Sequence, residues 1–96
     1  MKKDVALITG ASRGIGLAAA RQLAKDGYRV GIISTGPQER YPDAVAALKA
    51  DGAEFYWFSG DLGSSADRAR IAREAVQTLG EIRILVNNAG VAPKTR

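Results

Sequence analysis

The sequence predicts an α/β fold, a doubly wound parallel sheet of the Rossmann type. Three observations predict this class: short apolar runs alternate with helical patterns, the connections between them are short, and the first apolar run leads into a glycine-rich turn. Such an alternation is typical of parallel strands joined by right-handed helical crossovers. We expect four strands and three helices in the order βαβαβαβ, with strand order 3-2-1-4.

Each expected strand is a short apolar or aromatic run. Residues 4–9 carry the core Val-Ala-Leu-Ile, which is apolar on both faces, as a central parallel strand requires. In the third run, period-2 alternation places Phe55 and Trp57 on one face and Tyr56 and Phe58 on the other, as in a packed outer strand. The four strands are expected at residues 4–9, 29–34, 54–58 and 83–87.

The first two helices are expected at residues 14–26 and 42–50. Gly27 suits the position after the first helix, and Pro42 suits the first turn of the second. In the first helix, one apolar stripe is expected to face the sheet. It consists of Ile15, Ala18, Ala19 and Leu23.

The third helix is expected at residues 65–79. Ser64 and Asp67 resemble a capping pair at its start, and Gly80 marks its end. Its buried side is expected to consist of Ile71, Ala75, Val76 and Leu79.

The glycine-rich turn lies between the first strand and the first helix. Gly10 allows a tight turn, while Gly14 and Gly16 leave room for a ligand and for close packing of the helix on the strand. The start of the helix offers free N–H groups, including that of Ile15, and the positive end of its dipole. This pattern predicts a site for the pyrophosphate of a dinucleotide such as NAD(P). The structural alternative is a tight turn without a ligand.

Two polar residues inside the turn extend this prediction. Ser12 and Arg13 can add hydrogen bonds and positive charge near the phosphates. The expected binding crevice lies between strands one and four, where the strand order reverses.

Three motifs, in order, resemble those of the short-chain dehydrogenase/reductase family. Residues 9–16 match the family pattern T-G-x-x-x-G-I-G in full, Asp61-Leu62 follows the third strand, and residues 87–90 read Asn-Asn-Ala-Gly, the family's N-N-A-G. The resemblance spans nearly the whole chain, and within the family it is greatest to members like the 3-oxoacyl-acyl-carrier-protein reductases.

The resemblance implies roles for the later motifs. Asp61 would accept a hydrogen bond from the adenine amino group, and the N–H of Leu62 would complete that recognition. Asn87 would tie neighbouring strands together. The residues that would line the nicotinamide side are Asn88, Ala89 and Gly90. For Asp61, a carboxylate that serves only the entry to the next helix is the structural alternative.

The end of the second strand bears on the choice between NAD and NADP. An acid there would bind the adenosine ribose hydroxyls and repel a 2′-phosphate. This chain has Ser34 and Thr35 instead, and Arg13 lies nearby in the family's arrangement. We therefore expect NADP(H) to be preferred over NAD(H). Arg40 is a further candidate, although a plain surface role is favoured.

No catalytic residue is predicted in this chain. The family transfers a hydride between the nicotinamide and a carbonyl or alcohol with the help of a Ser and a Tyr-x-x-x-Lys pair. The fourth residue after each tyrosine is Ile32, Val45 or Gly60. We expect a cofactor-binding half that does not catalyse alone.

The fourth strand suggests that the domain is incomplete. Residues 84–86 read as buried on both faces, so a further segment should cover them and pair with the free edge. We expect residues 1–96 to be the N-terminal portion of a longer protein, with the remaining C-terminal part as the cover. The resemblance further implies a homo-oligomer.

The amino-acid composition limits the kinds of binding partner that this chain is expected to have. The net charge of +4 could suit nucleic acid, but acidic residues are scattered among the basic ones, and the aromatic run 55–58 has no interleaved basic residues. A mixed-charge surface is therefore favoured, with no nucleic-acid partner.

The chain has no Cys and no His, which removes thiolate metal sites and the commonest general base. No apolar run approaches a membrane span of about 18 residues, so we expect a cytoplasmic protein without a membrane partner.

Three other functions fit parts of the sequence. A non-catalytic dinucleotide-binding module would account for the motifs without a reaction. A serine hydrolase could use Ser12 in Gly-Ala-Ser-Arg-Gly, a G-x-S-x-G pattern, but its triad needs a His and residues 87–90 would be unexplained. A methyltransferase-like domain would need an acid after the second strand, where Ser34 and Thr35 stand.

Overall fold

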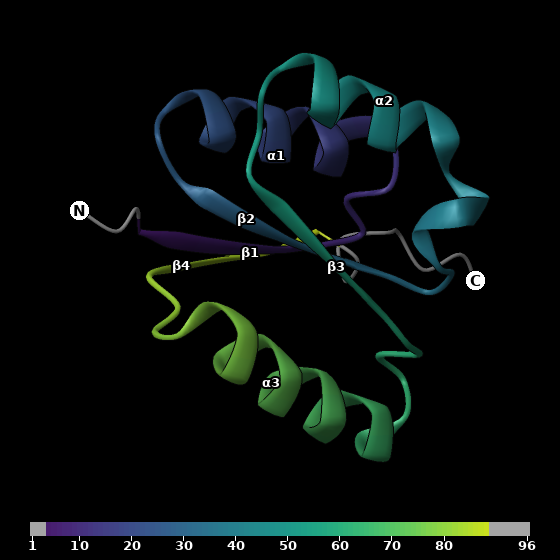
Figure 1. Ribbon diagram of the computed structural model, residues 1–96. Helices are drawn as coiled ribbons and strands as arrows, with labels where there is room; N and C mark the ends of the chain where they lie inside the picture. The colour runs from purple at the N-terminus through teal and green to yellow at the C-terminus, as the bar shows by residue number, and fades with distance from the viewer. Residues whose placement is uncertain (1–3, 89–96) are drawn as a thin grey trace.

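The computed structural model describes residues 4–88, and in them a parallel sheet lies between two helical layers (Figure 1). Helices α1 (Gly14–Lys25) and α2 (Pro42–Ala50) cover one face, and α3 (Ser65–Leu79) covers the other. The sheet has the order β3-β2-β1-β4, as predicted. Its strands are β1 (Val5–Thr9), β2 (Arg29–Ser34), β3 (Phe55–Ser59) and β4 (Ile84–Asn87).

All strand pairs are parallel, so their carboxyl ends meet at one edge of the sheet. Thr9 of β1 is in register with Ile33 of β2 and with Asn87 of β4, and Ser34 of β2 is in register with Ser59 of β3. The strand order reverses beside β1, where the glycine turn begins. Ligands of open α/β sheets bind at this kind of switch point.

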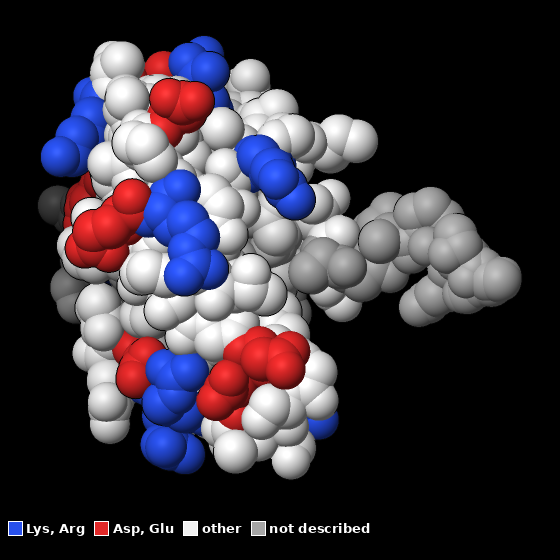
Figure 2. All heavy atoms as spheres, turned by 90° about the vertical axis from the view of Figure 1, so that its right-hand side faces the viewer, with Lys and Arg blue, Asp and Glu red and all other residues white. Residues whose placement is uncertain are grey.

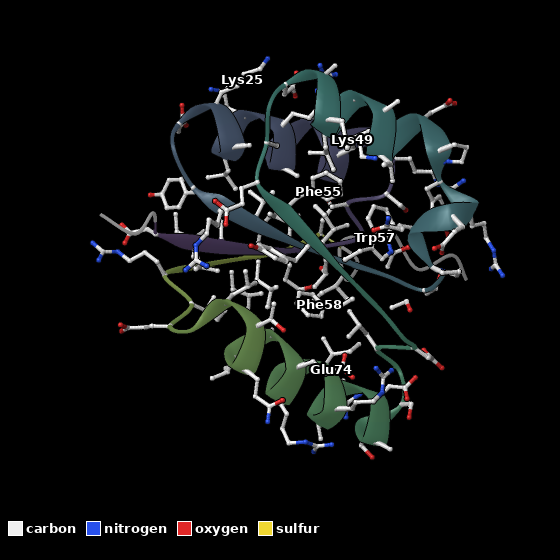
Figure 3. All side chains as sticks on the ribbon, viewed as in Figure 1. Lys25, Lys49, Phe55, Trp57, Phe58 and Glu74 are labelled. Carbon is white, nitrogen blue, oxygen red and sulfur yellow. The ribbon has the colours of Figure 1, made fainter. Side chains whose placement is uncertain are left out.

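The two faces of the sheet carry separate apolar clusters. Ala6 and Ile8 of β1 pack toward α1 and α2, whereas Val5 and Leu7 pack toward α3. The aromatic strand divides as predicted: Phe55 and Trp57 contact the first cluster, and Tyr56 and Phe58 belong to the second. In Figure 3, Phe55 and Trp57 lie on the α1–α2 side of β3 and Phe58 on the α3 side.

The expected buried stripe of α1 is wrong at Ile15 and Ala18, which are exposed, whereas Leu23 packs on the core as expected. Ile15 is 81% exposed, and the buried residues of the helix are Gly16 and Ala20. Small residues one turn apart let the helix lie close against the sheet, and Leu17 and Leu23 fill the flanks. In α3 the expected stripe is right except at Val76, which is 56% exposed because it lies about 100° around the helix from the neighbouring Ala75.

The helix ends follow the predicted signals. The Ser64 hydroxyl accepts a hydrogen bond from the Asp67 N–H at 3.2 Å, which caps α3. Gly27 and Gly80, which follow α1 and α3, have φ values of 101° and 87°, where glycine is favoured. One element was not predicted, a short 3₁₀ turn, η1 (Gln38–Arg40), inside the expected loop after β2.

Within residues 4–88 the fourth strand is covered on one face only, and the cover expected for its other face stays a prediction. Ile84 and Val86 pack against the α1–α2 cluster, but Leu85 on the α3 side is 63% exposed. Leu85 lines an apolar hollow of about 460 Å³, together with Ile71 and Ala72 of α3. Among the described helices, none has the length and apolar character needed to cross a membrane.

Candidate cofactor-binding site

A pocket of about 360 Å³ opens at the carboxyl edge of the sheet, between the glycine turn and the ends of β2 and β3. It brings together seven predicted site residues from three separate segments. These are Gly10, Ser12, Arg13, Ser34, Thr35, Asp61 and Leu62. Gly14, Ile15, Gly16 and Asn88 are not part of its wall. The volume lies in the range of small-molecule sites, about 300–1,000 Å³.

The glycine turn requires its glycines for two different reasons. Gly10 and Gly14 have φ values of 65° and 62°, and a Cβ on Gly14 would meet no atom within 4 Å. A Cβ on Gly16 would lie 2.2 Å from the Gly10 carbonyl oxygen and 2.9 Å from Nδ2 of Asn88. Gly14 therefore serves backbone conformation and an open surface, whereas Gly16 serves the close packing of α1 on the end of β1.

The start of α1 is left open to a ligand. The N-cap residue, Arg13, makes no side-chain capping bond within the described structure, and the first turn contains no acidic residue. The start of α3 differs, because Ser64 caps it and Asp67 stands in its first turn. The first N–H groups of α1 therefore keep their hydrogen-bonding capacity, and they carry the positive end of the helix dipole directly after the basic residue Arg13.

The end of β2 carries hydroxyls in place of an acid. Ser34 is 5% exposed, and its hydroxyl accepts a hydrogen bond from the Gly36 N–H at 3.4 Å. Thr35 follows and is exposed. Because Arg13 lines the same pocket, the pocket offers hydroxyl groups and a positive charge.

The end of β3 supplies the one carboxylate of the pocket wall, Asp61. One oxygen of this carboxylate accepts the Gly63 N–H at 2.8 Å, and the Asp61 N–H donates to the Asp67 carboxylate at 2.8 Å. Asp61 thus shapes the turn that leads into α3. Its contact with adenine remains a prediction, as does that of the Leu62 N–H.

The end of β4 lies against the glycine turn. Asn88 Nδ2 donates to the Gly10 carbonyl at 3.4 Å, and the Thr9 hydroxyl donates to Oδ1 of Asn87 at 3.2 Å. The structural role expected for Asn87, tying β4 to β1, is confirmed. Ala89 and Gly90, predicted on the nicotinamide side, lie outside the described residues.

Sequence reasoning missed four residues of the pocket wall, Ile33, Tyr41, Gly60 and Gly63, and among them Tyr41 has the polar side chain. It lies between η1 and α2, lines the pocket and stacks on Trp57, with ring centroids 5.7 Å apart and planes inclined by 24°. Hydrogen bonding to Ser34, and after it to Thr35, lowers the pKa of the Tyr41 phenol below its usual range. No local pattern identifies this residue, since its place depends on contact with a strand that comes later in the chain.

These residues fit a dinucleotide. Open amides and a cation suit a pyrophosphate, and glycine leaves the surface above the helix start clear. The single carboxylate of the pocket wall, Asp61, comes from the segment after β3, whereas Arg13 comes from the glycine turn. Over the face seen in Figure 2, which views the molecule from the end where β3 stops, acidic and basic side chains are interspersed. Within residues 4–88 no cluster of His, Cys, Asp and Glu could hold a metal ion.

Comparison with known proteins agrees with this fold and site. The family model described as short chain dehydrogenase matches residues 4–96, and the chain belongs to the short-chain dehydrogenase/reductase family. The chain is 37% identical over 86 residues to the 3-oxoacyl-acyl-carrier-protein reductase FabG of Staphylococcus epidermidis, a match that covers 90% of this chain. It is 44% identical over 93 residues to dehydrogenase/reductase SDR family member 4 of Oryctolagus cuniculus, covering 97% of this chain. In both cases the match covers 35% of the relative.

Solved structures of the family superpose closely on the chain. A short-chain dehydrogenase/reductase from Sinorhizobium meliloti 1021 gives a TM-score of 0.83 at 35% identity, covering 96% of this chain and 42% of that one. An actinorhodin polyketide ketoreductase solved with NADPH gives 0.82 at 34% identity, covering 92% and 34%. The family's proteins are thus oxidoreductases with NADP(H)-bound members, and this chain spans about a third of the length of the curated relatives it matches.

Proposed function

We propose that this chain binds NADP(H) and is the cofactor-binding part of an oxidoreductase that transfers a hydride between the nicotinamide and a carbonyl or alcohol. One observation carries the proposal: Arg13, the N-cap residue that leaves α1 without a side-chain cap, lines a pocket together with Ser34 and Thr35 at the end of β2 and with Asp61. The pyrophosphate would be bound by the N–H groups of Gly14, Ile15 and Gly16. Ser12 and Arg13 would flank it.

The preference for NADP(H) is proposed from charge. Ser34 and Thr35 offer hydroxyls where an acid would repel a 2′-phosphate, and Arg13 adds a positive charge on the same pocket wall. Two similar solved structures support this preference for NADP(H), because a ketoreductase was solved with NADPH and a metagenomic short-chain oxidoreductase was solved with NADP.

The bound nicotinamide supplies or accepts the hydride in this chemistry, while the residues of this chain bind and orient the cofactor. Asn88, with Ala89 and Gly90, would lie toward the nicotinamide. No tyrosine of the chain is followed four residues later by a lysine, so the proton donor is proposed to come from outside residues 1–96. The substrate is proposed to be a carbonyl or alcohol compound, as the name of the FabG relative suggests.

The exposed face of β4 supports a second part of the proposal. Leu85 is 63% exposed beside an apolar hollow, and the curated relatives are about three times as long as their matched segment. We propose that a further segment of the same protein covers this face. A homo-oligomer and a cytoplasmic location stay predictions.

Titration calorimetry with NADPH and NADH tests the proposal. We expect both nucleotides to bind, NADPH more tightly, and the preference to shrink as salt screens the phosphate contacts. Tighter binding of NADH would contradict the cofactor preference, and no binding of either would contradict the proposed function.

Labelling of Ser12 by a serine-directed phosphonate would favour the hydrolase alternative. A non-catalytic module would bind both nucleotides while the full-length protein reduced no carbonyl.

A further inference from the structure

Tyr41 and Trp57 form an aromatic pair at the end of β2 that the proposed function does not use. Tyr41 precedes α2, and Trp57 lies in the middle of β3 on the α1–α2 side of the sheet (Figure 3). Their rings stack at 5.7 Å. Tyr41 lines the pocket beside Ser34 and Thr35, whereas Trp57 stands behind it, half-buried against the apolar cluster.

Trp57 holds the segment between β2 and α2 at two points. Its Nε1–H donates to the Gly36 carbonyl at 2.9 Å, and its face packs on the Tyr41 ring. At Gly36 the segment is so compact that a Cβ would lie 3.1 Å from the Arg40 side chain and 3.2 Å from Cε2 of Tyr41. The phenol is therefore held from two sides, by Trp57 of the sheet and by the compact segment around Gly36.

The phenol of Tyr41 interacts with the hydroxyl groups of neighbouring serine and threonine side chains. Side-chain hydrogen bonding to Ser34, then Thr35 and more weakly Ser12, lowers the pKa of Tyr41, and the positive charge of Arg40 acts in the same direction. Hydrogen bonds that lower a phenol pKa are donated to the phenol oxygen. A phenol can also donate its own proton, and an anion is the acceptor that gains most from it.

We propose that Tyr41 is a specificity-determining residue that donates its phenol proton to the 2′-phosphate of NADP(H), with Trp57 as its positioning residue. This inference rests on the proposed function, because it names one contact within the same cofactor site. Ser34 and Thr35 complete the phosphate's surroundings on the β2 side, and Arg13 faces it from the glycine turn. The 5′-phosphate of the adenosine would make no contact with the phenol.

Two half-nucleotides isolate this contact, because the adenosine end of the site lies within the described residues. Adenosine 2′,5′-bisphosphate carries the 2′-phosphate, and adenosine 5′-monophosphate lacks it. Calorimetry on the wild-type chain, Tyr41→Phe and Trp57→Phe measures the ratio of the two affinities. Tyr28→Phe is the matched control, since Tyr28 packs on the apolar cluster and does not line the pocket. Circular dichroism and thermal midpoints verify that each variant folds.

For Tyr41→Phe we expect about a tenfold loss of affinity for the bisphosphate, the size of one hydrogen bond to a charged group, with the monophosphate unaffected. Trp57→Phe keeps a stacking ring but loses the donor to Gly36, so the ratio should fall by less. Tyr28→Phe should leave it unchanged. Trp57 is the chain's single tryptophan, so its emission should change more with the bisphosphate than with the monophosphate.

The outcomes separate the two proposals. An unchanged ratio in Tyr41→Phe, or an equal loss for both nucleotides, overturns the role of Tyr41 while the cofactor site stands. An unchanged ratio in Trp57→Phe overturns the positioning role of Trp57. If neither nucleotide binds the wild-type chain, the proposed function fails and this inference fails with it.

Discussion

Gly16 of α1 faces the Gly10 carbonyl so closely that a Cβ on Gly16 would lie 2.2 Å from its oxygen. Backbone atoms make this contact, so no side chain can move aside to relieve it. The contact brings the start of α1 against the end of β1, directly after the turn residues Gly10, Ser12 and Arg13 that line the pocket. The proposed pyrophosphate site therefore depends on this packing.

The first prediction concerns Gly16→Ala. The added methyl should lower the free energy of unfolding by about 1–3 kcal/mol, the cost of overpacking, and weaken NADPH binding by displacing α1. Gly14→Ala is the comparison, because its Cβ would meet open space and only the φ of 62° opposes it, at about 1–2 kcal/mol. Urea unfolding and calorimetry measure both effects. A Gly16→Ala variant as stable as wild type would show that the close contact is wrong.

The second prediction concerns the charge of Arg13. Arg13→Gln should weaken NADPH about tenfold and NADH less, because a charge-assisted contact to phosphate is lost. The salt dependence of NADPH binding should also become shallower. Arg73→Gln, on the exposed side of α3, is the matched control and should change neither affinity. An Arg13→Gln variant with unaltered affinities would remove this residue from the site.

The third prediction concerns the end of β2. Thr35→Asp places a carboxylate beside the proposed 2′-phosphate. Because Thr35 is exposed, we expect the fold to tolerate this substitution. The preference should reverse, with NADPH weakened by about tenfold or more through charge repulsion and NADH favoured by contacts to the ribose hydroxyls. Thr35→Asn is the uncharged control. Retention of the NADPH preference in Thr35→Asp would place the 2′-phosphate elsewhere.

The fourth prediction concerns an ion pair between α1 and the end of α2. Arg21 Nε donates to Asp51 Oδ2 at 2.7 Å and Nη2 donates to Oδ1 at 3.0 Å. Hydrogen bonding to Arg21 lowers the pKa of Asp51 below its usual range. Because the folded-state pKa is the lower one, the pair stabilises the fold above the unfolded pKa of about 4, and this contribution is lost as the pH falls through the folded-state value.

Urea unfolding as a function of pH checks this expectation. Asp51→Asn should be less stable than wild type near neutral pH, and the difference should shrink below about pH 4. Glu74→Gln, in the exposed pair with Arg70 on α3, is the control and should have little effect. A stability difference that persists unchanged at low pH would contradict a role for the Asp51 charge.

Most of the fold could be predicted because its signals are local. Apolar runs mark the strands, and Gly27, Ser64 and Gly80 mark helix ends that the structure confirms. The rotation of α1 could not be predicted, since an apolar stripe through Ile15 and a small-residue stripe through Gly16 are both possible in a sequence that is apolar on several sides. Contact with Gly10 selects the second.

The site was predictable where motifs carry it and not where tertiary contacts do. Seven motif residues from three segments line one pocket because parallel strands end at one edge. Tyr41 joins them through stacking on Trp57, a residue 16 positions later, and no spacing rule links the two. Likewise the sequence shows that Asp61 precedes α3, but its bond to the Gly63 N–H depends on the fold of the turn.

The most direct test of the central claim is a titration of the ¹⁵N-labelled chain with NADPH, followed through its backbone amide resonances. The account predicts saturable shifts at Gly14, Ile15 and Gly16, where the open N–H groups of α1 would bind the pyrophosphate, together with shifts at Ser34 and Thr35. Shifts that leave these amides unmoved and gather instead around Leu85 and Ile71, on the opposite face of the sheet, would contradict it.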